Sequence, residues 1–174
     1  MHNYFLKTKR IGFSKWNYDD LELATKLWGN KEVGKYIHAN HFFSVEEIHE
    51  RLKEEIKNEE YFHIQYFPIF SLSDNQFIGC CGFRPFVDNP QQIEMGFHLL
   101  PAFWHQGYAF EASDAILKYI HNKHRELKIY AGHHPDNEAS ARLLKKLGFL
   151  YFKDEFYKPT NKYHRCYQYS KNIA

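Results

Sequence analysis

The sequence predicts one domain of the mixed α/β class, built on a central sheet that is mostly antiparallel. In the first half of the chain, two segments rich in aromatic and β-branched residues flank a short turn, which indicates an antiparallel hairpin. In the second half, a strand pattern, a helix pattern and another strand pattern follow one another, which favours a parallel crossover between two middle strands. We therefore expect a mixed sheet of about seven strands, flanked by about four helices.

Five elements are expected in the first half of the chain. Ser44 is a plausible N-cap with Glu47 three residues later, and apolar residues then recur at helical spacing. This helix is expected to end near Asn58. The other four elements are a strand over residues 4–13, a helix over 19–27, and a hairpin of two strands over 61–72 and 77–86.

The second half is expected to alternate between strands and helices. Gly96, inside a strand pattern, suggests a bulge or the close approach of another group, and Gly148 is a suitable residue to end a helix. No linker or repeat marks a boundary, so residues 1–174 should form a single domain. The expected elements are a strand over 93–100, a helix over 108–124, a strand over 127–133, a helix over 137–147, and strands over 149–157 and 163–169.

Composition and charge argue against several classes of protein. The 23 basic and 21 acidic residues are interspersed and give a net charge of +2, so no nucleic-acid partner is indicated. No stretch approaches the roughly 20 apolar residues of a membrane span, and the first ten residues lack a signal-peptide pattern. We therefore expect a cytoplasmic protein with no membrane partner. Cys80 and Cys81 are adjacent and should be reduced thiols in or near the core.

The segment over residues 101–112 lies between a predicted strand and an amphipathic helix. Gly107 allows a positive φ or a close approach, and Ala109 leaves room for a ligand. The first amides of a helix are unpaired donors at the positive end of its dipole, an environment that suits a pyrophosphate. An ordinary helix start with a turn glycine explains the same letters, so this segment is not specific by itself.

A second motif begins at Asn137, 30 residues after Gly107, and has the form N-x-x-S-x-x-L-x-x-x-x-G-F. Asn137 is a good N-cap and Gly148 a good C′ residue, so a capped helix explains this motif alone. The specific signal is the pair of motifs in this order, separated by one helix and one strand.

With these two motifs the sequence resembles the GNAT superfamily of acyl-CoA N-acyltransferases, and within it the branch of RimJ/RimL-type ribosomal-protein N-terminal acetyltransferases. The resemblance covers nearly the whole chain, including Asp19-Asp20 at a helix start and Glu94-Met95-Gly96-Phe97 before the loop. It implies that the strands over 93–100 and 127–133 splay apart in a V, and that acetyl-CoA is the co-substrate.

The resemblance also implies where acetyl-CoA lies. Along the first splayed strand, the residues facing the pantetheine would be Phe97, His98 and Leu99. In the loop, the amides holding the pyrophosphate would be those of His105, Gln106, Gly107, Tyr108 and Ala109. Asn137 and Ser140 would lie near the pantetheine end and the thioester.

Two positions depart from the superfamily pattern. Trp104 stands where the phosphate loop usually opens with Gln or Arg. Leu144 stands where many members have a tyrosine that protonates the leaving thiolate, and leucine has no proton to give. Ser140 matches a serine that is thought to serve the leaving sulfur in the resembled branch. Alternatively, its hydroxyl bonds a backbone group in the first turn of the helix.

A base is also needed, because only a neutral amine attacks a thioester and a free α-amine has a pKa near 8. Glu94 is the first candidate, directly or through a water, since it lies on the strand expected to border the active crevice. Alternatively, Glu94 pairs with a neighbouring strand. His98, four residues along on the same face, is a second candidate base.

The predicted reaction is transfer of an acetyl group to a primary amine, by direct attack in a ternary complex. A peptide or protein N-terminal α-amine fits the resembled branch best. Two alternatives stay open: a small amine such as a polyamine or aminoglycoside, favoured by the acidic side of the helix after Ser44, and a non-catalytic acyl-CoA-binding module, favoured by Leu144. Residues expected to wall the acceptor pocket, or else to belong to the core, are Trp28, Tyr36, His38 and Phe42.

No metal is expected. Adjacent His133 and His134 should diverge on a strand, and no cysteine or carboxylate cluster accompanies them or the pair His121 and His124. The protein is expected to be a monomer or a homodimer.

Overall fold

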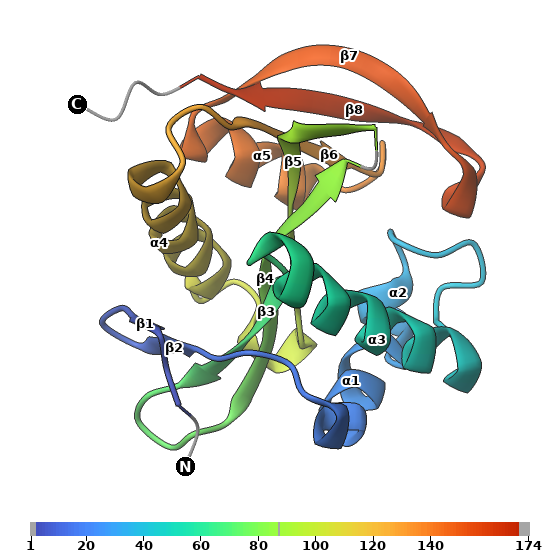
Figure 1. Cartoon of the computed structure of the whole chain (residues 1–174). Coiled ribbons are helices and arrows are strands. Elements are labelled where there is room, and N and C mark those ends of the chain that lie inside the picture. The colour runs from blue at the N-terminus through green and yellow to red at the C-terminus, as the bar shows by residue number, and fades with distance from the viewer. Residues whose placement is uncertain (1–2, 87, 171–174) are drawn as a thin grey trace.

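A single eight-stranded sheet runs through the computed structural model, which describes residues 3–86 and 88–170. Its strand order is β1-β2-β3-β4-β5-β6-β8-β7 (Figure 1). The strands are β1 (Leu6–Lys7), β2 (Ile11–Phe13), β3 (Tyr66–Ser71), β4 (Phe77–Phe86), β5 (Asn89–Leu99), β6 (Lys128–His133), β7 (Phe149–Tyr157) and β8 (Lys162–Tyr169). The described α-helices are α1 (Leu21–Trp28), α2 (Lys31–Gly34), α3 (Val45–Phe62), α4 (Tyr108–Lys123) and α5 (Glu138–Leu147).

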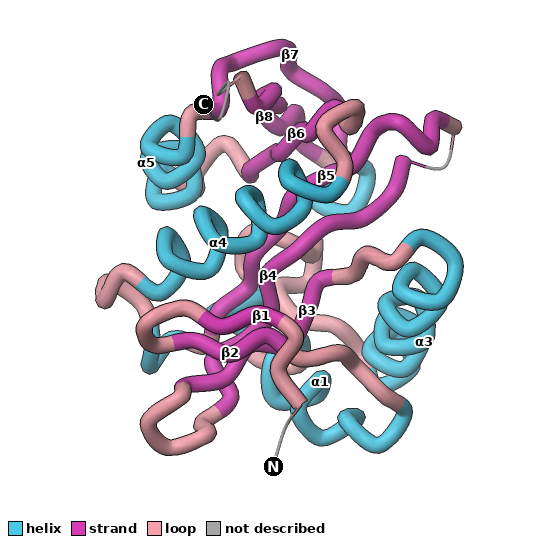
Figure 2. The backbone as a smooth tube through the Cα atoms, turned by 60° about the vertical axis from the view of Figure 1, so that its left-hand side comes forward, coloured by secondary structure: helices cyan, strands magenta, loops and turns pink. Residues whose placement is uncertain are grey.

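The expected mixed and mostly antiparallel sheet is confirmed. β5 and β6 pair in parallel, with α4 as the crossover between them. The pairs β3–β4, β4–β5, β6–β8 and β7–β8 are antiparallel. The helices cover both faces, with α4 and α3 on opposite sides of the strands in both views (Figures 1 and 2).

Each face of the sheet has its own apolar core. On one face, residues of α4 and α5 pack on alternate residues of β4 and β5, among them Phe83, Met95, Ile116 and Leu144. On the other face, α1, α2 and α3 pack on the intervening residues, among them Trp28, Leu52, Tyr66 and Cys80. Because side chains alternate along a strand, Glu94 and His98 of β5 belong to the second face.

Helix caps form where the sequence places them. The Ser44 hydroxyl accepts a hydrogen bond from the Glu47 amide, and the Glu47 carboxylate accepts one from the Ser44 amide, so the capping box is confirmed. Gly148 ends α5 with a φ of 96°, a left-handed conformation that glycine adopts without strain. Gly96 faces the Tyr66 ring so closely that a Cβ would overlap it, as the expected close approach requires.

Several boundaries differ from the sequence prediction, including the start of β5, which lies at Asn89 instead of residue 93. The strand expected over residues 4–13 is a hairpin of β1 and β2, because the Thr8 hydroxyl accepts a hydrogen bond from the Ile11 amide and closes a turn. This hairpin gives the sheet its eighth strand. In addition, α3 continues past Asn58 to Phe62 and ends at His63, which has a φ of 57°. The following strand therefore begins at Tyr66 instead of residue 61.

Within residues 3–86 and 88–170, no helix has both the length and the apolar character needed to cross a membrane. Cys80 and Cys81 are buried free thiols, as expected.

Candidate active site

The pairing between β5 and β6 stops halfway along β5. Its register runs from Gln92 opposite Lys128 to Met95 opposite Ala131. Beyond that point, residues 96–99 pair with β4, whereas residues 132–133 pair with β8. Two backbone edges thus face each other without pairing to one another among the described residues. Since buried backbone groups need hydrogen-bond partners, a ligand between these edges would supply them.

A tight loop follows β5 and leads into α4. His105 and Gly107 both adopt left-handed conformations, with φ values of 59° and 81°. Among the described residues, no acceptor meets the amides of His105, Gln106 or Gly107, and the first amides of α4 are unpaired donors by position. These amides, at the positive end of the helix dipole, suit a diphosphate group.

Trp104 ties this loop to the end of β5. Its indole N–H donates a hydrogen bond of 2.7 Å to the carbonyl oxygen of Leu99. This bond fixes the loop against the strand. Because an indole can donate but not accept a hydrogen bond, the Trp104 side chain does not use any of the loop amides. The side chains of Phe97 and Leu99 point to the α4 face, whereas His98 points to the α1–α3 face.

Arg10, in the β1–β2 turn, supports the same loop and was not anticipated from the sequence. Its Nη1 donates to the carbonyl oxygen of Gln106 at 3.1 Å, and its Nε lies 2.7 Å from Oε2 of Glu111. Its guanidinium also lies 4.1 Å from the centre of the Tyr108 ring. A positive charge is thereby held beside the start of α4. No local motif marks this role, because Arg10 and Glu111 are 101 residues apart.

Glu94 lies next to the point where β5 and β6 separate. Its register partner on β4 is Arg84, but the Arg84 guanidinium pairs with Glu55 of α3 at 2.5 Å. In the part of the chain that the structure describes, no hydrogen bond or ion pair engages the Glu94 carboxylate. Burial raises the pKa of Glu94; the Arg84 charge opposes this shift, and the Glu155 charge adds to it.

His98 is held as a neutral ring. The Trp28 indole N–H, which can only donate, lies 3.2 Å from Nδ1 of His98, so Nδ1 is the accepting nitrogen. Burial, together with the charges of Arg51 and Arg84, lowers the pKa of His98 well below its usual value. Because its accepting lone pair is already occupied, His98 is less suited than Glu94 to take a proton.

The first turn of α5 follows the carboxyl end of β6 and carries the Ser140 hydroxyl. Oδ1 of Asn137 accepts a hydrogen bond of 3.1 Å from the Ser140 amide, which caps the helix. No hydrogen bond among the described residues engages Oγ of Ser140, so the alternative of a backbone-bonded hydroxyl is not observed. Leu144 is 1% exposed and belongs to the core.

The four residues expected around the acceptor lie in two places. Trp28 is fully buried and bonds His98, and Tyr36 packs 5.4 Å from His134 just after β6, measured between ring centres. His38 instead pairs with Glu47, with Nε2 3.1 Å from Oε1. Phe42 is 40% exposed, beside Lys31. Only Trp28 and Tyr36 therefore contact residues at the ends of β5 and β6.

A group of buried and partly buried polar side chains on the α1–α3 face was also not anticipated from the sequence. This polar cluster consists of Arg51, Glu55, Tyr66 and Arg84. Oε2 of Glu55 accepts a hydrogen bond of 2.7 Å from the Tyr66 amide, and the Arg84 guanidinium lies 4.5 Å from the Tyr66 ring centre. One sequence signal existed, since Arg51 and Glu55 fall four residues apart within the apolar pattern of α3.

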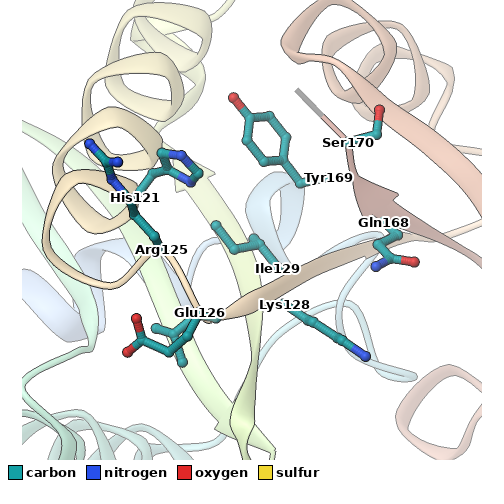
Figure 3. A pocket seen from close by; sticks show the side chains of 9 residues that line it. His121, Arg125, Glu126, Lys128, Ile129, Gln168, Tyr169 and Ser170 are labelled. Atoms are coloured by element: carbon teal, nitrogen blue, oxygen red, sulfur yellow. The ribbon is translucent and has the colours of Figure 1, made fainter. Parts of the chain in front are cut away.

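A pocket of about 290 Å³ lies at the opposite end of α4, between His121, Arg125, Lys128 and Tyr169 (Figure 3). Helices rise about 1.5 Å per residue, so this pocket is roughly 20 Å from the loop before α4. It borders the amino end of β6, and neither Glu94 nor Ser140 lines it. Among the described residues, no group of three His, Cys, Asp or Glu side chains is arranged to hold a metal ion.

The chain matches a family model over residues 10–150, and that family is described as an acetyltransferase (GNAT) domain. It is also 26% identical over 146 residues to p20 of Bacillus licheniformis, an uncharacterized N-acetyltransferase. That match covers 83% of this chain and 81% of p20.

Two solved structures share the fold. A GNAT-family acetyltransferase from Bacillus anthracis superposes with a TM-score of 0.75 at 23% identity, covering 94% of this chain and 95% of that one. RimL, a ribosomal L7/L12 alpha-N-protein acetyltransferase solved in complex with coenzyme A, superposes with a TM-score of 0.79 at 14% identity. That match covers 95% of this chain and 97% of RimL.

Proposed function

This chain belongs to the GNAT family of acetyl-CoA-dependent N-acetyltransferases, and on that premise we propose that it acetylates the α-amine at a peptide or protein N-terminus. The family match confirms the resemblance drawn from the two sequence motifs. The observation that carries the proposal is the Glu94 carboxylate, partly buried at the separation of β5 and β6 with its potential partner Arg84 already bound to Glu55.

Glu94 is suited to take a proton from the acceptor. A carboxylate without an ion-pair partner and with a raised pKa is a stronger base than an exposed glutamate. Acetyl-CoA supplies the activated acetyl group. Glu94, directly or through a water, would accept the proton that the amine loses, and the Ser140 hydroxyl would donate a hydrogen bond to the leaving sulfur.

The binding of acetyl-CoA is supported by the two features that flank this position. The unpaired edge over residues 96–99 offers backbone groups to the pantetheine amides, and the loop amides from His105 to Ala109 suit the pyrophosphate. Asn137 caps α5, so its proposed contribution is to hold the Ser140 turn in place. RimL, which has the same fold, was solved in complex with coenzyme A, and this supports acetyl-CoA as the co-substrate.

A peptide amine is favoured over a polyamine by the orientation of α3. The acidic residues that suggested a polycation lie on the exposed side of this helix, among them Glu46, Glu50, Glu54 and Glu60. The side of α3 that faces the sheet carries Arg51, and Glu55 there is neutralised by Arg84. A polycation bound at Glu94 would therefore meet the positive charge of Arg51, which repels it, instead of a cluster of carboxylates.

A CoA-release assay tests the proposal after acetyl-CoA binding has been measured by calorimetry. Peptides beginning with Ala, Ser or Met should turn over, whereas spermidine and an aminoglycoside should not. Turnover on spermidine alone would assign the chain to the small-amine class. Tight acetyl-CoA binding with no turnover on any amine would support the non-catalytic binding module instead.

Replacing Ser140 with alanine should lower kcat by roughly tenfold or more, since proton or hydrogen-bond donation to a leaving group is typically worth 10²–10⁴ and water can replace part of it. The acetyl-CoA dissociation constant should change less than twofold, because the helix cap uses the Ser140 amide and not its hydroxyl. Stopped-flow and calorimetry measure the two quantities. An unchanged kcat would remove Ser140 from the mechanism.

Replacing Gly107 with alanine should weaken acetyl-CoA binding about tenfold. A non-glycine residue at a φ of 81° costs about 1–2 kcal/mol, and relief of this strain would turn the loop amides away from the pyrophosphate. Gly148→Ala is the matched control, because Gly148 has a φ of 96° at the far end of α5. Both variants should lose similar stability, and only the first should lose affinity. Equal affinities in calorimetry would contradict the assignment of the loop.

A further inference from the structure

Arg51 is enclosed by aromatic rings on the face of the sheet that carries Glu94. Its guanidinium carbon lies 4.7 Å from the ring centre of Trp28, 5.1 Å from that of Phe43 and 6.0 Å from that of Tyr66. Such stacking leaves the edge of the guanidinium plane, where its N–H donors point, available for hydrogen bonds.

No acceptor meets these donors within the described part of the chain. Nε of Arg51 is a buried nitrogen without a hydrogen-bond partner, and no carboxylate forms an ion pair with the guanidinium. Glu55, one helical turn along α3, is committed to Arg84 through two hydrogen bonds of 2.5 and 3.1 Å. Burial lowers the pKa of Arg51 and the Arg84 charge lowers it further, yet an arginine remains charged at neutral pH.

A partly buried positive charge with a buried, unused donor is unfavourable unless an anion reaches it. The surroundings that Arg51 shares with Glu94 indicate which kind of anion would bind there. The Tyr66 ring lies 6.0 Å from the guanidinium carbon of Arg51 and also comes close to Gly96, two residues from Glu94. The charges of Arg51 and Glu94 also act on the pKa of the same two phenols, Tyr66 and Tyr157: the Arg51 charge lowers each pKa and the Glu94 charge raises it.

We infer that Arg51 binds a carboxylate of the acceptor, so that the amine activated at Glu94 belongs to a molecule with an acidic group close to that amine. The inference rests on the proposed function, because it takes the α1–α3 face as the side from which the acceptor enters. A planar guanidinium matches a carboxylate through two parallel hydrogen bonds, which a lysine would not reproduce. Two sources share this chemistry, namely an acidic residue near a peptide N-terminus and the free carboxylate of an amino acid.

Matched acceptor pairs test the inference in the CoA-release assay with saturating acetyl-CoA. One pair is an Ala-Asp peptide amide against its Ala-Asn counterpart, and the other is alanine against alaninamide. The acidic member of at least one pair should have a kcat/KM at least tenfold higher, and the pair that shows this identifies the source. Arg51→Met should bring that ratio close to one, mainly through KM, and Arg51→Lys should restore only part of it.

Lys53→Met is the control, since Lys53 is an exposed cation on the same helix that pairs with Glu50. This variant should keep the preference for the acidic member. A purely structural role for Arg51 would reduce both members of each pair equally and leave their ratio unchanged. That result, or equal turnover of acidic and neutral members by the native protein, would overturn the inference.

A binding measurement separates this inference from the proposed function. Because Arg51 stacks on Trp28, a carboxylate that engages the guanidinium should alter tryptophan fluorescence. With coenzyme A present, the acidic peptide or alanine should give a saturable change that the neutral partner and the Arg51→Met variant do not give. This readout needs no turnover. Absence of a saturable change with both acidic ligands would overturn the inference even if N-terminal acetylation is found.

Discussion

Replacing Glu94 with glutamine should lower kcat/KM by about 10²–10⁴, the usual contribution of a general base. Glutamine keeps the shape of the side chain but cannot accept the proton from the amine. Acetyl-CoA affinity should stay within about twofold, because the loop and the strand edge proposed to bind it do not involve the Glu94 side chain. Single-turnover rates and calorimetry, performed on the same preparation, measure these two effects separately.

The pH profile gives the same residue a distinct signature. Only the ionised form of Glu94 takes a proton, so kcat/KM should rise with pH through the pKa of Glu94, which burial raises above the usual value near 4.3. In Glu94→Gln this acid limb should disappear. A second limb near about 8, from deprotonation of the acceptor's α-amine, should remain.

Glu155→Gln is the matched control for this profile. Glu155 is an exposed carboxylate on β7 whose negative charge contributes to raising the pKa of Glu94. Removing that charge should move the acid limb to lower pH and leave the plateau rate unchanged. A Glu94→Gln variant that keeps both its rate and its acid limb would show that another group, or the solvent, accepts the proton.

Replacing Glu55 with glutamine should destabilise the protein by about 3–5 kcal/mol, the usual cost of breaking a buried ion pair. The Glu55 carboxylate is fully buried and bonds both the Arg84 guanidinium and the Tyr66 amide. Burial alone would lower the pKa of Arg84, but the Glu55 charge raises it above its usual value. Without Glu55, the Arg84 charge would lack its partner. For a chain of this length, the fall in Tm should be roughly 6–20 °C.

Two further variants show whether the loss comes from the unpaired charge. Glu50→Gln removes an exposed carboxylate that pairs with Lys53 on the same helix and should leave the unfolding curve unchanged. The double variant Glu55→Leu with Arg84→Met removes both charges of the pair and should recover most of the stability lost in Glu55→Gln. If Glu55→Gln and Glu50→Gln unfold at the same denaturant concentration, the buried pair does not stabilise the fold.

The sequence by itself determined the features that depend on neighbouring residues. The capping box at Ser44, the cap at Asn137 and the glycine at 148 each follow from local backbone geometry. Strands and helices over most of the second half also matched their predicted ranges to within a few residues, because their apolar residues recur at a fixed spacing. The loop before α4 was also recognisable from the sequence, because Gly107 is directly followed by the start of a helix.

Only the tertiary structure decided which side chains are paired and which are free. Glu94 was a candidate base from the sequence, but only the fold shows that Arg84 bonds Glu55, 29 residues away in the sequence, and so leaves both Glu94 and Arg51 without a hydrogen-bond or ion-pair partner among the described residues. The loop likewise depends on Arg10, brought to it by the β1–β2 hairpin. Periodicity shows which face of an element is apolar, but the partner of a buried charge depends on the packing of segments far apart in the chain. The local pattern therefore located the elements of the site, and the packing of the sheet and α3 determined the charges within it.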